Sequence, residues 1–518
     1  MSRTPRRRAA CWLLAGWLLT GSALALRGGD LVPAPRAEPL PPALQAAVEG
    51  LDAGRMARHM AFLTDPARQG RGLGTTGLDA TVRYLAKELD ALGLPPLQGD
   101  RRQTVPLRRI EPGGGHLRLR TTEGTLTFRA GRDLVLPPLA PGILDAPVVF
   151  AGYGIQEPAL GHDDFRGLDV RGKVVVFRAG CPPGPAWEKA DLLEKYASPR
   201  SADRYDARLA LLEKLGARAA IAVEDGLETR LARGLEPGTP YFLAAPGVLA
   251  AGEPPLARVA LTPELRALLL NLRGRAALRV RGQVTPTRGF NVLAKVEGSD
   301  PALKDEVILI GAHMDHLGLP GGILHPGADD NASGVSALLE IARVLAAAPI
   351  RPRRTIAIAF WTGEEEGKFG SGHYTRHPRW PLAKTRAYLN LDMIGHPWTR
   401  AELSALAADL GQKGALDGVD PARFAEPGPA AGHRDLGPVL VRAGAGTAMA
   451  LHLDWTDGRH GGSDYRDFAR RDVPFVRFFG SYFPGYHTPA DTLDQLDPAQ
   501  VRRMARLVLA SAWLLADR

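Results

Sequence analysis

Three consecutive segments decide the fold: EVILIGAH (306–313), SGVSALLEIARVLAAA (333–348) and RTIAIAFW (354–361). The first and third are short, continuously apolar runs, whereas the second repeats its apolar residues at helical spacing. Apolar strands joined by a helix are typical of a parallel sheet that is covered on both faces. The pattern continues through AYLNLDMIG, VPFVRFFG and a final helical segment, PAQVRRMARLVLASAWLLA. We therefore predict an α/β fold with a mostly parallel mixed sheet for residues 286–518.

The first 45 residues have the composition of targeting and linker sequence. An arginine-rich start is followed by an uncharged run from Ala9 to Leu26, in which ALA (23–25) fits a cleavage site for export. We predict a signal peptide over residues 1–25 and hence a secreted or periplasmic protein; an uncleaved membrane anchor is the alternative. Residues 26–45 are predicted to form a proline-rich linker, because five prolines fall between residues 27 and 44.

Two regions of different texture follow the linker. Residues 46–104 are helical, and LDATVRYLAKELDALGL (78–94) has amphipathic spacing that stops at Gly93 and Pro95. Residues 105–285 change to short β-type runs such as APVVFAGYGI and GKVVVFRAG, separated by glycine and proline. We predict that this second region is a separate, mostly β insert, and it contains no cluster of metal-type ligands.

Charge and cysteine content argue against several classes of function. The 518 residues carry a net charge of +9, and removal of the signal peptide takes away four arginines and leaves +5. The basic residues are scattered, without a stripe interleaved with aromatics, which argues against nucleic-acid binding. Cys11 leaves with the signal peptide, so Cys181 is the only cysteine of the mature chain. Neither an intrachain disulfide nor a thiolate metal site is therefore expected.

Metal-type side chains gather at the ends of the predicted strands, and ten of the thirteen histidines follow residue 312. The candidates are His313, Asp315, Asp329, Asp330, Asn331, Glu364, Glu365, Glu366, Asp392, Tyr486 and His487. Taken singly, each has a plain structural explanation, such as a helix cap or a solvated acidic turn. In a parallel sheet, however, ligands gather at the carboxyl ends of the strands. The joint pattern therefore favours one functional site.

Two imidazoles with three carboxylates and no thiolate suit zinc, with cobalt or manganese as possible substitutes. A single metal ion would leave surplus ligands. Two ions about 3.5–4 Å apart that share one carboxylate would use all five. The negative charge of the carboxylates also offsets that of two divalent ions in a buried site. We therefore predict two Zn²⁺ ions per chain.

Within residues 286–518 the motifs GAHMDHLG, PGADDNASGVSALLE, EEEGKFGSGHY, LNLDMIGH, GGSDYRDF and YHTPADTLDQLD follow one another in this order, and GRGLGTTG occupies 70–77. Together they resemble the co-catalytic zinc aminopeptidase family, which also contains glutamate carboxypeptidases and glutaminyl cyclases. The resemblance implies a zinc exopeptidase fold, with residues 46–104 as the N-terminal part of the peptidase domain. FAGYGIQEP and DDFRGLDVRGKVVVFRAG resemble the protease-associated (PA) domain, which implies a substrate-access role for residues 105–285.

The resemblance implies a metal-binding role for five side chains. His313 and Asp392 would hold one zinc, Glu365 and His487 the other, and Asp330 would bridge them. Asn331 indicates Asp330 rather than Asp329 as the bridge. In the acidic triplet, the family pattern of a glutamate pair, a variable residue and glycine leaves Glu366 as the variable position.

Three further residues have implied catalytic roles. Glu364 would be the general base, which takes a proton from a metal-bridging water and passes it to the departing amine. Tyr486 would donate to the developing oxyanion. Asp315 would accept from the other nitrogen of His313 and fix its tautomer. His316, His373 and His460 occupy no family ligand position and are predicted to be structural or surface residues.

The implied activity is hydrolysis of the amino-terminal bond of peptides or proteins. A carboxypeptidase or dipeptidase of the same family is the main alternative, and it needs a basic pocket, for which Arg459, Arg466 and Arg477 are candidates. A catalytically inactive, receptor-like binding module is an alternative of another class, although such relatives tend to lose ligands. One departure is that Ser463-Asp464-Tyr465 stands where many relatives have Ser-Asp-His. The sequence leaves the oligomeric state open.

Overall fold

The computed structural model describes residues 31–32, 39–136, 141–188, 190–197, 203–232, 241–244, 255–459 and 461–518. The predicted signal peptide and His460 lie outside the described residues. Where the chain is described, none of its helices combines the length and the apolar character that crossing a membrane requires.

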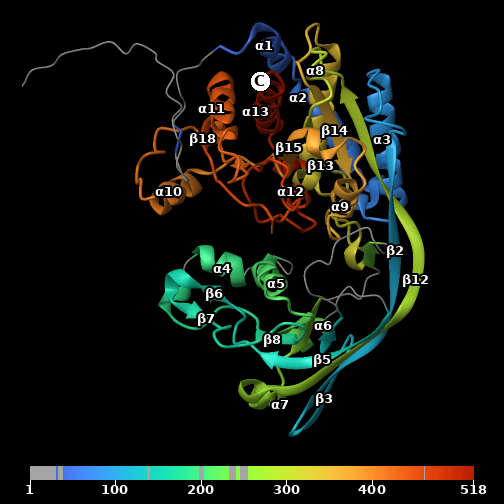
Figure 1. Ribbon diagram of the computed structural model, residues 1–518, viewed down its shortest axis with the longest axis vertical. Helices are drawn as coiled ribbons and strands as arrows, with labels where there is room; N and C mark the ends of the chain where they lie inside the picture. The colour runs from blue at the N-terminus through green and yellow to red at the C-terminus, as the bar shows by residue number, and fades with distance from the viewer. Residues whose placement is uncertain are drawn as a thin grey trace, which may run out of the picture.

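A mixed, mostly parallel sheet lies at the centre of the α/β part of the molecule (Figure 1). Its parallel strands, in spatial order, are β19 (Phe475–Phe478), β15 (Thr385–Leu391), β13 (Val307–His313) and β14 (Thr355–Trp361). The antiparallel strands β17 (Gly428–Pro429) and β12 (Arg273–Val296) flank them. Every residue of β13 and β14 is buried, as their unbroken apolar sequences require. The predicted α/β fold with a mostly parallel mixed sheet is confirmed.

Helices pack against this sheet. α8 (Gly334–Ala347) and α13 (Pro498–Ala516) pack on β13, β14 and β15, and α13 also contacts α2 (Ala53–Thr64) and α11 (Leu436–Thr447). α9 (Phe369–Arg376) packs on β14, and α12 (Tyr465–Ala469) packs on β15 and β19. One apolar core runs through these elements, and it includes buried apolar side chains of the N-terminal helices, from Leu44 to Leu89. The N-terminal helices therefore share a core with the sheet.

The N-terminal helices begin and end where local chemistry dictates. α3 (Thr76–Ala91) begins where the Thr75 hydroxyl accepts from the amide of Leu78, and it ends just before Gly93, whose φ is 67°. α1 (Pro42–Glu49) begins inside the predicted linker. Proline suits this position, because the first amides of a helix have no intrahelical acceptor.

A second, β-rich part is joined to the first by a long antiparallel ribbon of β2 (Arg102–Thr121) and β12, which Figure 1 shows along one side of the molecule. The other strands of its sheet include β5 (Gly142–Phe150), β8 (Val174–Arg178), β9 (Ala219–Glu224) and β11 (Leu256–Ala260), which run parallel to one another. Its helices include α4 (Ala190–Ala197), α5 (Asp203–Leu215), α6 (Leu227–Ala232) and α7 (Pro263–Leu268). The predicted boundaries of the insert, residues 105 and 285, fall within β2 and β12.

Candidate metal centre

The candidate ligands come from the carboxyl ends of neighbouring strands. His313 is the last residue of β13, Asp392 follows β15 directly, and Glu364 and Glu365 follow β14 after a two-residue turn. Asp330 lies in the turn before α8, and His487 lies in the loop after β19. Because β13, β14, β15 and β19 are parallel, their carboxyl ends meet at one edge of the sheet. The fold thus gathers side chains that are up to 174 residues apart in the sequence.

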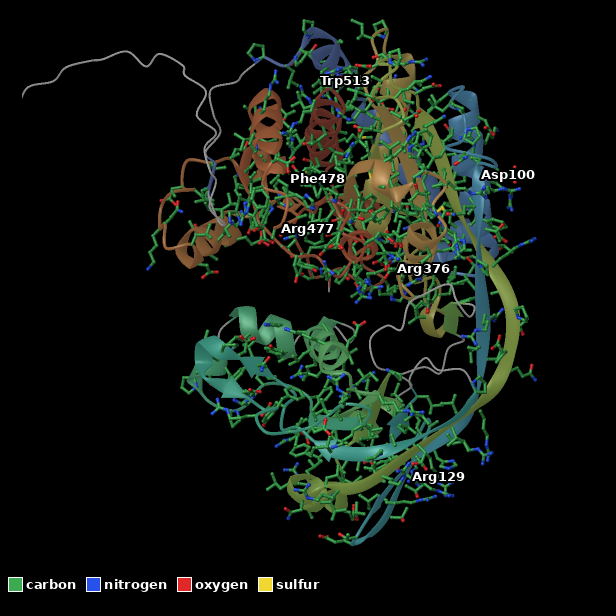
Figure 2. All side chains as sticks on the ribbon, viewed as in Figure 1. Asp100, Arg129, Arg376, Arg477, Phe478 and Trp513 are labelled. Carbon is green, nitrogen blue, oxygen red and sulfur yellow. The ribbon has the colours of Figure 1, made fainter. Side chains whose placement is uncertain are left out.

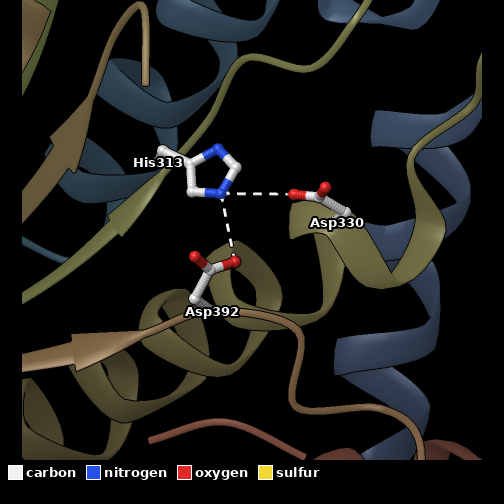
Figure 3. A group of neighbouring side chains, drawn as sticks. All are labelled: His313, Asp330 and Asp392. Carbon is white, nitrogen blue, oxygen red and sulfur yellow. Dashed lines mark hydrogen bonds and ion pairs between the residues drawn. The ribbon is translucent and has the colours of Figure 1, made fainter. Parts of the chain in front are cut away.

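The first group consists of His313, Asp330 and Asp392 (Figure 3). The Nε2 atom of His313 lies 3.1 Å from Oδ1 of Asp392 and 3.3 Å from Oδ1 of Asp330. The His313 side chain is 1% exposed and that of Asp330 is 4% exposed, so water screens these charges poorly.

The second group uses the other oxygen of Asp330. The Nε2 atom of His487 lies 3.1 Å from Oδ2 of Asp330 and 3.2 Å from Oε2 of Glu365. Ligands about 2.0–2.1 Å from a tetrahedral zinc lie about 3.3–3.4 Å from one another. The four nitrogen–oxygen distances in the two groups are close to this spacing. Asp330 therefore presents one oxygen to each group, which is the arrangement of a carboxylate that bridges two ions.

The carboxylates of both groups favour a positive charge between them. Burial lowers the pKa of His313, but the carboxylates of Asp392 and Asp330 outweigh it and hold that pKa well above its usual value. Burial opposes the shift of His487 in the same way, and Glu365 and Asp330 raise its pKa well above the usual value. Bound divalent cations would supply this charge without protonated imidazoles. The donor set thus fits the predicted metal.

His316, which was predicted to be a structural or surface residue, belongs to the same cluster and forms with Asp330 and Glu365 a group that could hold a metal ion. Its Nδ1 atom lies 2.6 Å from Oε1 of Glu365 and 3.7 Å from Oδ2 of Asp330, and its side chain is fully buried. A separation of 2.6 Å is a hydrogen-bond distance and is shorter than the spacing of two ligands on one zinc ion. His316 thus contacts the oxygen of Glu365 that His487 does not contact.

The contact predicted between Asp315 and His313 is wrong for this structure. Oδ1 of Asp315 accepts from the amide of Glu364 at 3.2 Å, and Oδ2 accepts from the amide of Glu365 at 3.3 Å. The Nδ1 atom of His313 has no hydrogen-bond partner among the described residues. The carboxylate of Asp315 therefore orients the turn that carries both glutamates, because two consecutive amides of that turn occupy its oxygens.

Glu364 faces a cavity of about 710 Å³ that both ligand groups also line. The Nζ atom of Lys368 lies 3.1 Å from Oε1 of Glu364. Burial raises the pKa of Glu364 to about 8, against the opposing effect of the Lys368 ammonium. Tyr486 lines the same cavity and stacks on His487, with 3.8 Å between the ring centroids. A buried carboxyl with a raised pKa beside such a cluster is suited to proton transfer near neutral pH.

Two residues outside the predicted site hold the Asp330 turn in place. The carboxylate of Asp491 accepts from the amide of Asp329 at 2.8 Å and from that of Asp330 at 3.1 Å. The fully buried Arg71 guanidinium donates to the carbonyls of Met314, at 3.0 Å, and Asp330, at 3.3 Å. Both residues lie inside quoted motifs, which was the available signal. Arg71 thus joins the turn of the bridging carboxylate to the segment after His313.

Fold and site together define an α/β protein with a candidate metal centre of histidines and carboxylates at one sheet edge. The model of the family described as Peptidase family M28 matches residues 291–512 of this chain. The Aminopeptidase from Aneurinibacillus sp. strain AM-1 is similar in fold, with a TM-score of 0.51 and 20% identity over 91% of this chain and 95% of that one.

Curated relatives match shorter segments. The chain is 39% identical over 113 residues to an aminopeptidase of Pseudomonas aeruginosa, covering 21% of this chain and 19% of the relative. It is 27% identical over 215 residues to Aminopeptidase YwaD of Bacillus subtilis (40% and 41%) and 30% identical over 251 residues to Probable lipoprotein aminopeptidase LpqL of Mycobacterium tuberculosis (42% and 46%). Each alignment spans less than half of the relative's length.

Proposed function

We propose that this protein is a zinc-dependent aminopeptidase that hydrolyses the amino-terminal bond of peptides. The observation that carries the proposal is the position of Asp330, which offers one carboxylate oxygen to each of two histidine–carboxylate groups beside Glu364. His313, Asp392 and Asp330 would hold one zinc ion, and His487, Glu365 and Asp330 the second. The match of residues 291–512 to a peptidase family model and the similarity to relatives named as aminopeptidases support this assignment.

The residues of the chain would divide the work of hydrolysis. When bound, the two zinc ions would act as Lewis acids and lower the pKa of water. Glu364 would accept the proton of the attacking water and deliver it to the departing amine, since its raised pKa suits both transfers. Tyr486 would donate its hydroxyl hydrogen to the oxyanion. Asp315 would hold Glu364 and Glu365 in position by accepting hydrogen bonds from their backbone amides.

We place the protein outside the cytoplasm, as a secreted or periplasmic enzyme, on the basis of the signal-like first 25 residues. A relative named as a lipoprotein supports export. We also propose that the β-rich part is a PA-like insert that limits access to the metal centre. Lys195 of α4 and Ala207 of α5 support this role, since both line the cavity that contains the metal-binding groups.

Three substrates test the proposed activity: leucine p-nitroanilide, its N-acetylated form and a peptide blocked at the amino terminus with a free carboxyl terminus. We expect the purified protein with added zinc to cleave the first and to spare the other two. Equal cleavage of the acetylated form would exclude an aminopeptidase. Cleavage of the blocked peptide alone would establish the carboxypeptidase alternative, and binding without turnover of any substrate would favour the receptor-like one.

A further inference from the structure

Among the described residues, the cavity beside the candidate metal centre is lined by four lysine and arginine side chains: Lys195, Lys368, Arg466 and Arg477. Three of them have a carboxylate partner within the protein. Nζ of Lys195 lies 2.6 Å from Glu157, and Nζ of Lys368 lies 3.1 Å from Glu364. Arg477, which Figure 2 labels next to Phe478 on β19, forms an ion pair with Asp454. Each of these three side chains therefore has an acidic partner within the protein.

Arg466 differs from the other three. Among the described residues, no carboxylate lies within ion-pair distance of its guanidinium, and its one hydrogen bond runs from Nη2 to the carbonyl of Gly367 at a long 3.5 Å. Its Nε atom is buried and has no hydrogen-bond partner in the described part of the chain. A half-buried guanidinium with unused donors carries a desolvation cost that an anionic ligand would offset.

The surroundings of Arg466 indicate which anion fits. Gly367 is three residues from Glu364, and both residues line the cavity together with the metal-binding groups. A carboxylate matches the guanidinium fork with two parallel hydrogen bonds. Peptides carry carboxylates at their carboxyl terminus and on Asp and Glu side chains. The cavity of about 710 Å³ is of a size that encloses small ligands.

We propose that Arg466 is a specificity-determining residue that binds a carboxylate of the peptide substrate. The inference rests on the proposed function and narrows its substrate class to short peptides that bear a negative charge near the scissile bond. The other two arginines that the sequence made candidates are unsuited to bind this carboxylate. Arg477 is paired with Asp454, and Arg459 is paired with Asp472 and does not line the cavity.

Matched dipeptides test this subsite. Leu-Gly is compared with Leu-Gly amide, which removes only the terminal carboxylate, and Leu-Asp amide adds a side-chain carboxylate instead. For the wild-type protein we expect kcat/KM for a carboxylate-bearing substrate to exceed that for Leu-Gly amide by about 10- to 100-fold, the range for a hydrogen-bonded charge. In Arg466→Gln we expect the preference to disappear through a higher KM for the carboxylate-bearing substrate, so that its kcat/KM falls to that for Leu-Gly amide. Whichever of Leu-Gly and Leu-Asp amide shows the preference identifies the carboxylate.

Two further variants serve as controls. Arg459→Gln removes an arginine of the same region that forms an ion pair with Asp472 at the surface. This variant should leave the preference unchanged. Arg466→Lys keeps the charge without the fork and should retain part of the preference; circular dichroism verifies that the variants fold. Equal rates on Leu-Gly, Leu-Asp amide and Leu-Gly amide, or an Arg466→Gln defect of the same size on every substrate, would overturn the proposal.

Failure of the proposed function gives a different result. If the wild-type protein cleaves no leucine p-nitroanilide, the same peptides are titrated by calorimetry. A carboxylate preference in affinity that Arg466→Gln abolishes then supports the subsite in a binding protein. Equal affinities for Leu-Gly, Leu-Asp amide and Leu-Gly amide overturn it.

Discussion

Glu364 and Glu365 are adjacent in sequence, yet their carboxylates have different surroundings. Glu365 has one oxygen near His487 and the other near His316, whereas Glu364 contacts Lys368 at the cavity. We therefore expect Glu364→Gln to keep both zinc ions and to lose about three orders of magnitude in kcat, because one residue serves two proton transfers. Glu365→Gln should lose one zinc ion. Metal analysis of both variants beside kcat distinguishes them, and loss of metal from Glu364→Gln would reverse the assignment.

The second prediction at this scale concerns the Nδ1 atom of His316. Its Nδ1 lies 2.6 Å from Oε1 of Glu365, so its expected task is to fix the carboxylate rather than to bind metal. The amide nitrogen of asparagine can take the place of Nδ1, whereas glutamine is one methylene longer. We expect His316→Gln and His316→Ala to weaken one of the two proposed zinc sites by about 10- to 100-fold, and His316→Asn to preserve it.

Zinc titration against a competing chelator measures these affinities without reference to activity. His373 provides the control, since it is buried but stands outside both ligand groups. Equal weakening in His316→Asn and His316→Ala would show that His316 is a ligand or a packing residue instead.

At the scale of elements, a single carboxylate joins the beginnings of three parallel strands. Glu306, directly before β13, lies 2.6 Å from Nε of Arg354, directly before β14, and also pairs with Arg386 of β15. The hydrogen bond from Arg386, helped by Arg354, lowers the pKa of Glu306 to about 2. The folded-state pKa is thus below the unfolded value, so this contribution to stability is complete above about pH 4.5 and is lost as pH falls toward 2.

We expect Glu306→Gln to have a lower free energy of unfolding than the wild-type protein at pH 7. This difference between the two proteins should become smaller as the pH falls below about 4.5. Urea unfolding of both proteins at several pH values measures this difference. Asp305→Asn is the matched control, because Asp305 is exposed and its ion pair joins only Lys384. A difference that stays constant over the acidic range would contradict the prediction.

The strands of the α/β part could be predicted because each is a continuous apolar run between turns. The ribbon of β2 and β12 could not be predicted from the sequence. Pro112 and the glycines 113–115 of β2 have the composition of a turn, yet the pairing continues across them, and a register shift between Val280 and Gly282 absorbs the irregularity. A pattern that is read along one strand contains no information about its partner. The ends of the insert were therefore predicted inside strands that continue through them.

The gathering of the candidate ligands could be predicted because they follow strands of one parallel sheet. The choice of Asp330 over Asp329 and of Glu365 over Glu366 came from the family resemblance, and Asp330 and Glu365 are the two that lie in the groups described above. The contacts around them could not be predicted. Whether Asp315 faces His313 or the amides of Glu364 and Glu365 depends on the path of a turn, and the sequence does not specify that path. Hydrogen bonds to backbone groups, such as those of Arg71, leave no pairing signal in the sequence at all.

At the scale of the whole molecule, the β-rich part contacts the α/β part next to the candidate site. Nη2 of Arg470, directly after α12, lies 3.1 Å from Oε2 of Glu213 on α5, and α5 also contributes Ala207 to the cavity wall. The ion pair therefore helps to set the distance between α5 and the metal centre. About a quarter of each side chain is exposed, so its strength is modest, at most about 1 kcal/mol.

We expect Arg470→Glu, which opposes two negative charges, to change kcat/KM for tetrapeptides and longer substrates by up to about fivefold, the factor that corresponds to 1 kcal/mol. Leucine p-nitroanilide reaches less far toward α5, so its cleavage should change less. The double variant Arg470→Glu with Glu213→Arg restores the attraction and should recover the wild-type value. Because the pair is partly exposed, the effect should also diminish as salt is raised toward 1 M. Two results would show that α5 does not control access through this contact. One is an equal change in kcat/KM for both kinds of substrate in Arg470→Glu, and the other is a double variant that fails to restore the wild-type kcat/KM.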